Sequence, residues 1–367
     1  MNDKKSQSVC SKVFIAGGGT GGHLFPGIAV AEVLRAEGCE VIFVNRGNDL
    51  ERRALSHAGF KHKTIWIEGV KGRGLKNKLV ALCKLPVAGL QSLWLTLRYR
   101  PKITIGLGSY SAGPVVIAAW LTRRPAALME QNSVAGFTNR QCGRFARKVF
   151  ITFPGSEKYF EPQKCVLSGN PVRASFFESL KAPVGRNDKF TVLILGGSQG
   201  AHAVNELVAQ SLQYVADKDA IRYIHQTGAY DAAALKEAYV RYGVEATVQD
   251  FFDDVAPLYQ AADFVICRAG ATTIAELTVL GKAAYFIPFP QAADNHQEKN
   301  AQVLVNAGAA LMGRESELSG KDLARVVNQM REPGSPLTAM QRASQALGKP
   351  NAARDVAQGC LELLKKA

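Results

Sequence analysis

The sequence predicts an α/β protein with two doubly wound, Rossmann-like parallel-sheet domains that face each other across a cleft. Apolar runs of the strand type alternate with helical patterns along most of the chain, as in successive βαβ units. The order strand, glycine-rich loop, helix occurs at 13–34 and again at 191–208. A chain of 367 residues is also long for a single core, so two domains in tandem are expected.

Each predicted strand is a short apolar run between polar or glycine-rich segments. In the first half, strands are expected at 13–16, 41–44, 102–107, 126–129 and 148–152. In the second half, they are expected from 191 and at 221–225, 246–249, 264–270 and 283–289. The pattern restarts after the turn at 169–173 and the polar stretch 181–189, which places a linker within 165–189. We therefore expect one domain over 8–172 and a second over 173–349.

Composition indicates a reduced, cytosolic environment. The seven cysteines are scattered without C-x-x-C spacing, which argues against a disulfide framework or a zinc site. The polar first residues do not have the apolar core of a signal peptide. The longest apolar run, 79–97, is interrupted by Lys84, Pro86 and Gln91, so a membrane-spanning helix is not expected.

The formal net charge of +14 is unevenly distributed. The segment 69–129 contains no Asp or Glu, although many of the basic residues fall there. Such a field attracts nucleic acid, anionic lipid headgroups or a phosphorylated substrate, and the alternative is a solvated face that only keeps the protein soluble.

Three glycine-rich loops follow predicted strands and precede predicted helices, at 17–22, 108–113 and 196–200. Successive backbone N–H groups at the positive end of a helix form an anion site. Because ligands bind beyond the carboxyl ends of parallel strands, all three loops are expected to line the same cleft.

The G-x-G-x-x-G spacing of Gly17, Gly19 and Gly22 also occurs in nicotinamide enzymes. Those enzymes need an acidic residue after the second strand to bind the ribose diol. Here Asn45 and Arg46 stand at that point. This excludes simple NAD binding and leaves only a phosphorylated cofactor, with Arg46 as its partner.

Three further positions carry candidate chemistry. His23 directly follows the first glycine loop, where the helix dipole favours a neutral imidazole base; a cap or packing role is the alternative. Glu276 lies early in a helix that follows a strand, where a carboxylate can accept both hydroxyls of a ribose or simply complement the helix dipole. The polar segment 294–297 has the composition of a ligand loop.

The D-x-D sequence at 217–219 precedes a strand, at the wrong end of the sheet for a metal site, and is assigned to a turn.

These segments together resemble the GT-B glycosyltransferases, and most closely the family that adds N-acetylglucosamine to lipid I, forming lipid II for peptidoglycan. The resemblance covers nearly the whole chain and rests on eight motifs in order, at 17–26, 106–114, 130–140, 169–173, 195–201, 251–263, 268–277 and 288–301. It implies an inverting transfer from UDP-N-acetylglucosamine to the C4 hydroxyl of the muramyl sugar. It also implies that the amphipathic C-terminal helix, 350–367, packs back on the first domain.

The resemblance implies a donor site mainly on the second domain. Ser198 would meet the pyrophosphate, Arg173 the phosphates, Phe252 the uracil through its backbone, and Glu276 the ribose. The remaining implied donor contacts are Thr20, Gly21, Gly22, Asn132, Ala271, Thr272, Thr273, Ile274, Ala275 and Gln297. Whether His296 shares the role of Gln297 stays open.

For the acceptor, the resemblance implies that the loops 17–22 and 108–113 take the lipid diphosphate. Gly18, Gly19, Gly108, Ser109 and Asn139 are the implied contacts. His23 would be the base or would position it, with Tyr110 nearby. Because backbone donors and arginine can stabilise the departing UDP, no protein-bound metal or other cofactor is required.

If the acceptor is carried on a polyprenyl lipid, the segment 69–129, which has no acidic residue, can bind the membrane surface. Leucines alternating with basic residues suit an anionic membrane surface, and the predicted membrane patch is Lys71, Arg73, Leu75, Lys76, Lys78, Leu79 and Lys84. The expected location is peripheral, on the cytoplasmic face of the bacterial inner membrane, with cell-wall synthesis proteins as further candidate partners.

Two rival functions are weighed. A nucleic-acid-binding module would use the basic stretch but leaves Glu276 and the glycine loops unexplained, so no nucleic-acid partner is expected. Another GT-B transferase, with a different sugar nucleotide or acceptor, is the serious alternative.

Overall fold

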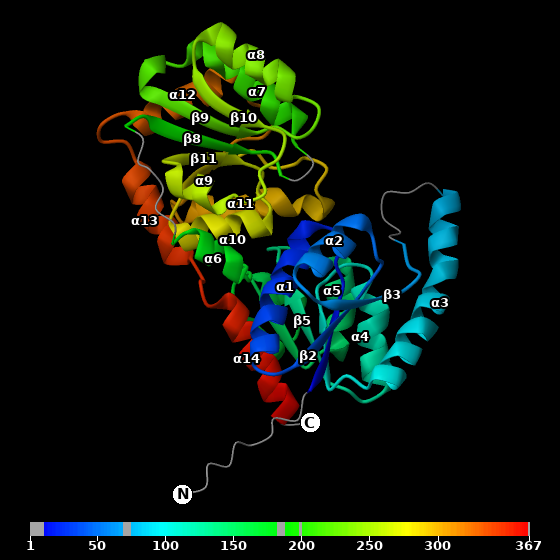
Figure 1. The fold of residues 1–367 in the computed structure, drawn as a ribbon. Helices are drawn as coiled ribbons and strands as arrows, with labels where there is room; N and C mark the ends of the chain where they lie inside the picture. Colours follow the sequence, from blue (N-terminus) through cyan, green and yellow to red (C-terminus); the bar gives the residue numbers. More distant parts are fainter. Residues whose placement is uncertain (1–10, 69–74, 182–187, 198–199, 366–367) are drawn as a thin grey trace, which may run out of the picture. The chain divides into compact units, whose positions relative to one another are not determined.

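The computed structural model describes residues 11–68, 75–181, 188–197 and 200–365, and for residues 75–83 it describes only the backbone. The chain divides into two compact units. The first runs to Arg173 and includes the residues from Pro350 onward, and the second comprises Ala174–Lys349. Each unit is built around one parallel sheet (Figure 1).

The first unit contains a seven-stranded sheet of order β3-β2-β1-β4-β5-β6-β7. Its strands are β1 (Lys12–Ala16), β2 (Glu40–Asn45), β3 (Lys61–Thr64), β4 (Ile103–Gly106), β5 (Ala126–Glu130), β6 (Lys148–Ile151) and β7 (Cys165–Leu167). Strand β1 pairs in parallel with both β2 and β4, so the strand order reverses there. Open sheets of this kind bind ligands at that point, beyond the carboxyl ends of the strands.

Helices cover both faces of this sheet. They are α1 (Gly21–Ala36), α2 (Asp49–His57), α3 (Leu75–Tyr99), α4 (Ala112–Leu121), α5 (Phe137–Cys142) and α14 (Ala352–Lys365). Helices α1, α2 and α14 share one buried apolar cluster with β1, β2 and β4. Helices α3 and α4 pack against the opposite face.

The C-terminal helix α14 packs on α1 within the first unit. Its residues Val356 and Cys360 are completely buried, as their shared helical face predicts. Full burial of a valine side chain stabilises a fold by about 1.5–3 kcal/mol, so this amphipathic face anchors the end of the chain to the first unit.

The second unit contains a six-stranded parallel sheet of order β10-β9-β8-β11-β12-β13. Its strands are β8 (Phe190–Leu195), β9 (Ile221–Gln226), β10 (Glu245–Gln249), β11 (Phe264–Cys267), β12 (Ala283–Phe286) and β13 (Ala310–Met312). Its helices are α6 (Ala174–Ser179), α7 (His202–Ser211), α8 (Ala232–Tyr242), α9 (Ala256–Ala261), α10 (Ala271–Leu280), α11 (His296–Asn306), α12 (Gly320–Arg331) and α13 (Leu337–Leu347). Helices α7, α8 and α12 cover one face, and α9, α10 and α11 the other (Figure 1).

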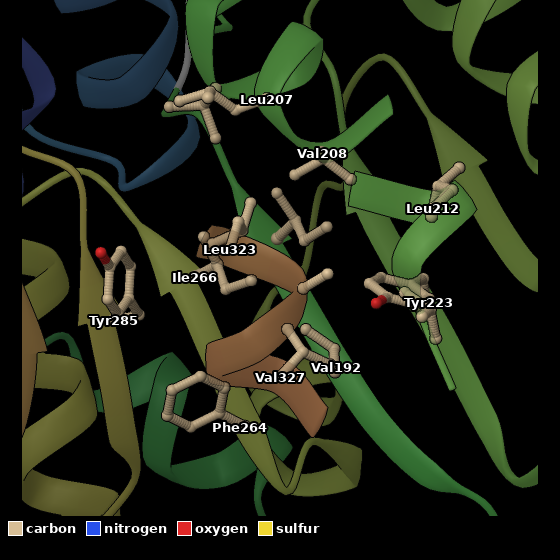
Figure 2. Close-up of a cluster of buried hydrophobic side chains, with 14 of the residues drawn as sticks. Val192, Leu207, Val208, Leu212, Tyr223, Phe264, Ile266, Tyr285, Leu323 and Val327 are labelled. Carbon is tan, nitrogen blue, oxygen red and sulfur yellow. The ribbon is translucent and has the colours of Figure 1, made fainter. Parts of the chain in front are cut away.

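The core of the second unit forms where α7 and α12 pack on alternate residues of β8 and β11. Figure 2 shows Leu323 and Val327 of α12 directed toward Val192 and Ile266. Alternate strand residues point to the same face, so Val192 and Ile266 share this side of the sheet with Phe264. This packed layer supports β8 and β11, whose carboxyl ends carry the loops before α7 and α10.

Three edge strands, β3, β7 and β13, were not among the predicted strands. Strand β3 consists of Lys61, His62, Lys63 and Thr64, so no apolar alternation marks it. Strands β7 and β13 have only three residues each. Residues 165–167, expected within the linker, instead form β7 and pair with β6. A strand at a sheet edge needs little apolar surface, because backbone hydrogen bonds to one neighbour define it.

Candidate functional site

The first glycine loop connects β1 to α1 and folds back on its own unit. Gly17, Gly18 and Gly19 all have positive φ, at 123°, 150° and 87°. Their amides donate within the protein: Gly17 to the oxygen of Val44 at 3.0 Å, Gly18 to Oγ of Ser109 at 3.0 Å, and Gly19 to Oε1 of Glu51 at 2.7 Å. The amides that remain available to an anion are those at the start of α1, residues 20–22.

Glu51 is a buried carboxylate that the sequence reasoning missed. It belongs to a capping box at the start of α2, in which Asn48 accepts from the Glu51 amide and Glu51 accepts from the Asn48 amide at 2.9 Å. A Cβ at Gly18 would collide with this carboxylate, which explains the glycine. Glu51 already occupies the Gly19 amide, so an anion at this loop is best placed against α1. The S/T/D/N-x-x-E spacing of capping boxes was the available signal.

His23 lies in the first turn of α1 and hydrogen-bonds to Gln131. Its Nδ1 is 2.9 Å from Oε1 of Gln131, whose side chain is buried. With Oε1 of Gln131 facing the ring, the imidazole hydrogen is on Nδ1 and the lone pair is on Nε2, because an amide oxygen can only accept. This is the tautomer that a general base acting through Nε2 requires.

Glu130 organises the loop that follows β5. Its carboxylate accepts from the amides of Asn132 and Gly136, both at 3.0 Å, and from Nδ2 of Asn139 at 2.9 Å. Asn139 is completely buried, and a Cβ at Gly108 would lie 2.6 Å from its Nδ2. Asn139 therefore supports the second glycine loop from beneath rather than presenting its amide at the surface.

The second glycine loop places Ser109 and Tyr110 beyond β4. Ser109 accepts from the Gly18 amide and lies 3.0 Å from the hydroxyl of Ser111, so the two glycine loops are joined. The hydroxyl of Tyr110 accepts a hydrogen bond from Arg46 at 3.1 Å. Arg46 stands where a nicotinamide enzyme would have its acidic residue, and here it orients Tyr110.

Arg173, the last residue of the first unit, is partly exposed. Its guanidinium lies 4.4 Å from the ring centroid of Phe25 in α1. This cation–π contact holds the arginine over the first helix while its N–H groups remain available to an anion.

The glycine loop of the second unit connects β8 to α7, and its Ser198 lies outside the described residues. The buried side chain of Gln226, at the end of β9, links this loop to the next. Its Nε2 donates to the oxygen of Gly197 at 3.1 Å, and its Oε1 accepts from the amide of Phe252 at 3.1 Å. The amide of Phe252 is therefore occupied, which leaves its carbonyl for a ligand. Sequence reasoning missed Gln226 because nothing local marks a bridging glutamine.

Helix α10 begins at the carboxyl end of β11 with Gly270 as its N-cap. The hydroxyl of Thr272 is buried and has no hydrogen-bond partner among the described residues. Glu276 lies further along this helix, where its Oε2 accepts from the hydroxyl of Tyr259 at 3.1 Å. Burial raises the pKa of Tyr259 well above its usual value, and the neighbouring Glu276 raises it further. Tyr259 is thus a permanent donor to Glu276.

His296 and Gln297 are the first two residues of α11, and both hydrogen-bond to the segment that connects this helix to β12. Oε1 of Gln297 accepts from the amide of Phe289 at 2.9 Å, so its NH₂ group is the end left for a ligand. His296 donates from Nδ1 to the oxygen of Ala293 at 2.7 Å. Asp294 and Asn295 both have left-handed backbones, with φ of 55° and 54°. Non-glycine residues in this conformation are concentrated at active sites and ligand-binding segments.

The predicted membrane patch lies partly outside the described residues, which exclude Lys71 and Arg73. Leu75, Lys76, Lys78 and Leu79 belong to α3, of which only the backbone is described at these positions. Lys84 is largely buried, pairs with Glu68 at 2.6 Å and lies 4.8 Å from the ring centroid of Trp66. Its ammonium therefore interacts mainly with its own unit.

The described part of α3 has an exposed apolar face. Leu90, Trp94 and Leu97 are 70%, 62% and 54% exposed and follow helical spacing. Trp120 and Leu121 of the neighbouring α4 are also exposed. Among the residues described, no helix has the length and apolarity needed to cross a membrane. The same residues contain no group of three or more His, Cys, Asp or Glu side chains suited to holding a metal ion.

The two doubly wound parallel sheets in tandem are those of the GT-B fold, the fold class of many glycosyltransferases. The chain belongs to glycosyltransferase family 28. The N-terminal domain of that family matches residues 13–151, and its C-terminal domain matches residues 191–357. The predicted fold class and family are thereby confirmed.

The chain is similar over its length to individual members of this family. It is 44% identical to the UDP-N-acetylglucosamine–N-acetylmuramyl-(pentapeptide) pyrophosphoryl-undecaprenol N-acetylglucosamine transferase of Myxococcus xanthus, with 96% of this chain and 93% of that protein covered. The Syntrophus aciditrophicus protein of the same name is also 44% identical, with 96% and 99% covered. The crystal structure of Acinetobacter baumannii MurG matches with a TM-score of 0.79 at 30% identity, covering 96% of this chain and 99% of that one.

Proposed function

We propose that this protein transfers N-acetylglucosamine from UDP-N-acetylglucosamine to the C4 hydroxyl of the muramyl sugar of lipid I, forming lipid II. The observation that carries the proposal is the match of both domains to transferases named for this reaction. The site geometry supports it, because His23 presents the lone pair of Nε2 beside the first turn of α1.

In this proposal the donor binds mainly to the second unit. Glu276, oriented by Tyr259, accepts the ribose hydroxyls. The carbonyl of Phe252 binds the uracil. The amides at the start of α10 and the loop before α7 together bind the diphosphate of UDP. The NH₂ group of Gln297 contacts the sugar. Asn132, Thr20 and the glycines 21–22 are the proposed donor contacts from the first unit.

The acceptor diphosphate is proposed to bind the first unit at the start of α1, together with Ser109 and the second glycine loop. The attacking C4 oxygen forms a bond to the anomeric carbon while the bond from that carbon to the phosphate oxygen breaks. The hydroxyl proton moves to Nε2 of His23, and UDP leaves with the electron pair of the broken bond. Arg173 and helix N-terminal amides stabilise the negative charge on UDP. Tyr110, oriented by Arg46, lies on the loop proposed to hold the acceptor.

A lipid acceptor requires access to a membrane surface, and we propose peripheral binding at the cytoplasmic face through α3 and α4. The exposed side chains of Leu90, Trp94 and Trp120 support this proposal, because Trp and Leu insert at the headgroup boundary. Binding to anionic vesicles tests it. Lys76→Gln and Lys78→Gln should each weaken binding more than Lys84→Gln, since Lys84 is engaged by Glu68. Equal or absent effects would assign the basic residues to solubility.

The choice of substrates is tested by measuring UDP release with two donors, in the presence and absence of a lipid I analogue. We expect release that depends on the lipid acceptor and that prefers UDP-N-acetylglucosamine to UDP-glucose. Lipid-independent transfer, or a preference for UDP-glucose, would instead indicate a GT-B transferase with another substrate pair.

A further inference from the structure

Gln131 connects His23 to a small polar pocket inside the first unit. Its Oε1 lies 2.9 Å from Nδ1 of His23, and its side chain is only 1% exposed. Its Nε2 is buried and has no hydrogen-bond partner among the described residues. The pocket into which the glutamine projects is lined also by Ser168, Asn170 and Thr152. Its apolar wall is formed by Phe150 and Val356.

Asn170 is the second polar group of this pocket. Its side chain is 3% exposed, and both Oδ1 and Nδ2 are buried without a hydrogen-bond partner in the described part of the chain. A buried amide that lacks a partner is destabilising, because it has given up its hydrogen bonds to water. The two amides line the same pocket and are complementary, because Gln131 has an unpaired donor and Asn170 an unpaired acceptor, although no hydrogen bond joins them in the described structure.

The orientation of the Gln131 amide decides which imidazole nitrogen of His23 carries hydrogen. With the oxygen toward His23, Nδ1 carries the hydrogen and Nε2 keeps its lone pair. With the NH₂ group toward His23, Nδ1 must accept, and Nε2 carries the hydrogen and cannot act as a base. The two orientations have the same shape, so only the hydrogen-bond partner at the far end of the amide distinguishes them.

We propose that Gln131 is a positioning residue that sets the tautomer of His23, and that Asn170 fixes Gln131 by accepting from its Nε2. This inference rests on the proposed function, in which His23 is the base. A neutral amide also suits a site that receives phosphates. A carboxylate in its place would favour the protonated imidazolium, which cannot take a proton at neutral pH.

The test combines a direct measurement of the tautomer with kinetics. Nitrogen-15 NMR of histidine-labelled protein reports which ring nitrogen carries hydrogen, and the His23→Asn variant assigns the signal. We expect the Nδ1–H tautomer in the unaltered protein and a mixture or the opposite tautomer in Gln131→Met and Asn170→Ala. Gln141→Met, an exposed glutamine in α5, is the matched control and should leave the signal unchanged.

In steady-state kinetics, Gln131→Met should lower kcat by at least about 10-fold, within the 10²–10⁴-fold that a general base contributes, while KM for UDP-N-acetylglucosamine stays constant. Gln131→Glu should move the acid limb of the pH–rate profile upward by about one pH unit or more. The inference is overturned by an Nε2–H tautomer in the unaltered protein, or by Gln131→Met with an unchanged tautomer and kcat. An unaltered protein with no transferase activity would overturn the proposed function, and the NMR result would still decide the inference.

Discussion

The hydroxyl of Tyr259 donates to Oε2 of Glu276 at 3.1 Å from a completely buried position in α9. The pKa of Tyr259 is raised well above its usual value, by burial and by the carboxylate beside it, so the phenol stays protonated and keeps donating. Glu276 is therefore held in one orientation before any ribose arrives. Tyr259 thus supports from behind a group that is proposed to touch substrate.

Tyr259→Phe removes this donor and keeps the packing of the ring. The loss of one hydrogen bond to a charged group costs about 1.5–3 kcal/mol, so we expect UDP to bind at least several-fold more weakly. Calorimetric titration with UDP measures the effect. Tyr239→Phe, another buried tyrosine of the same unit, is the control and should leave UDP affinity unchanged. Equal affinity in the Tyr259 variant would remove this tyrosine from the ribose site.

Gln226→Ala breaks the link between the two loops proposed to hold pyrophosphate and uracil. The variant loses two buried hydrogen bonds, to Gly197 and Phe252, and each is worth about 0.5–1.5 kcal/mol. We expect KM for UDP-N-acetylglucosamine to rise roughly 10-fold, with a smaller change in kcat. Gln213→Ala, on the exposed surface, is the matched control. A fall in kcat at constant KM would place Gln226 outside the donor site.

Because His225 is buried, we expect the stability of the second unit to fall at acid pH. Burial lowers the pKa of His225 to about 3, while the unfolded chain titrates near 6.5. Between these values the unfolded state binds more protons, so the stability that His225 contributes is present above pH 6.5 and is lost as the pH falls toward 3. The free energy of unfolding should fall by up to about 1.4 kcal/mol per pH unit in this window.

Urea unfolding of His225→Gln at pH 7 and pH 5 checks this expectation. The variant should show a shallower dependence on pH than the unaltered protein, whatever its stability at pH 7. His296→Gln, a partly exposed histidine of the same unit, should retain the original dependence. If the free energy of unfolding depended on pH equally in all three proteins, His225 would not be the group responsible for the loss of stability in acid.

Gly18→Ala tests the close approach of the first glycine loop to Glu51. The new methyl group would collide with the carboxylate, at a φ of 150° that side chains rarely adopt. A forced backbone of this kind costs about 1–3 kcal/mol, which thermal unfolding measures. Gly243→Ala also has positive φ but has open space around its Cβ, so it should cost less. Equal losses would show that the conformation alone, without Glu51, requires the glycine.

The sequence predicted the central strands and the glycine loops because these are marked locally, by apolar runs such as 191–195 and by glycine spacing. It did not predict β3, whose four residues are polar and lie at a sheet edge. It proposed His23 and Glu276 from their positions at helix starts, but not Gln131, Glu51 or Gln226. Those side chains act across 108, 32 and 26 residues of sequence separation. A contact between residues so far apart in sequence depends on the order of the strands in the sheet, and the hydrophobic periodicity of one sequence does not specify that order.

The most direct test of the account is transfer of labelled N-acetylglucosamine from its UDP donor to a lipid I analogue, comparing the unaltered protein with His23→Ala. We expect a labelled disaccharide lipid and one UDP per transfer. The His23 variant should be slower by roughly 10²–10⁴-fold with donor binding unchanged. Absence of label in the lipid product despite donor turnover would contradict the proposed reaction, and near-normal transfer by His23→Ala would contradict the role of His23 as its base.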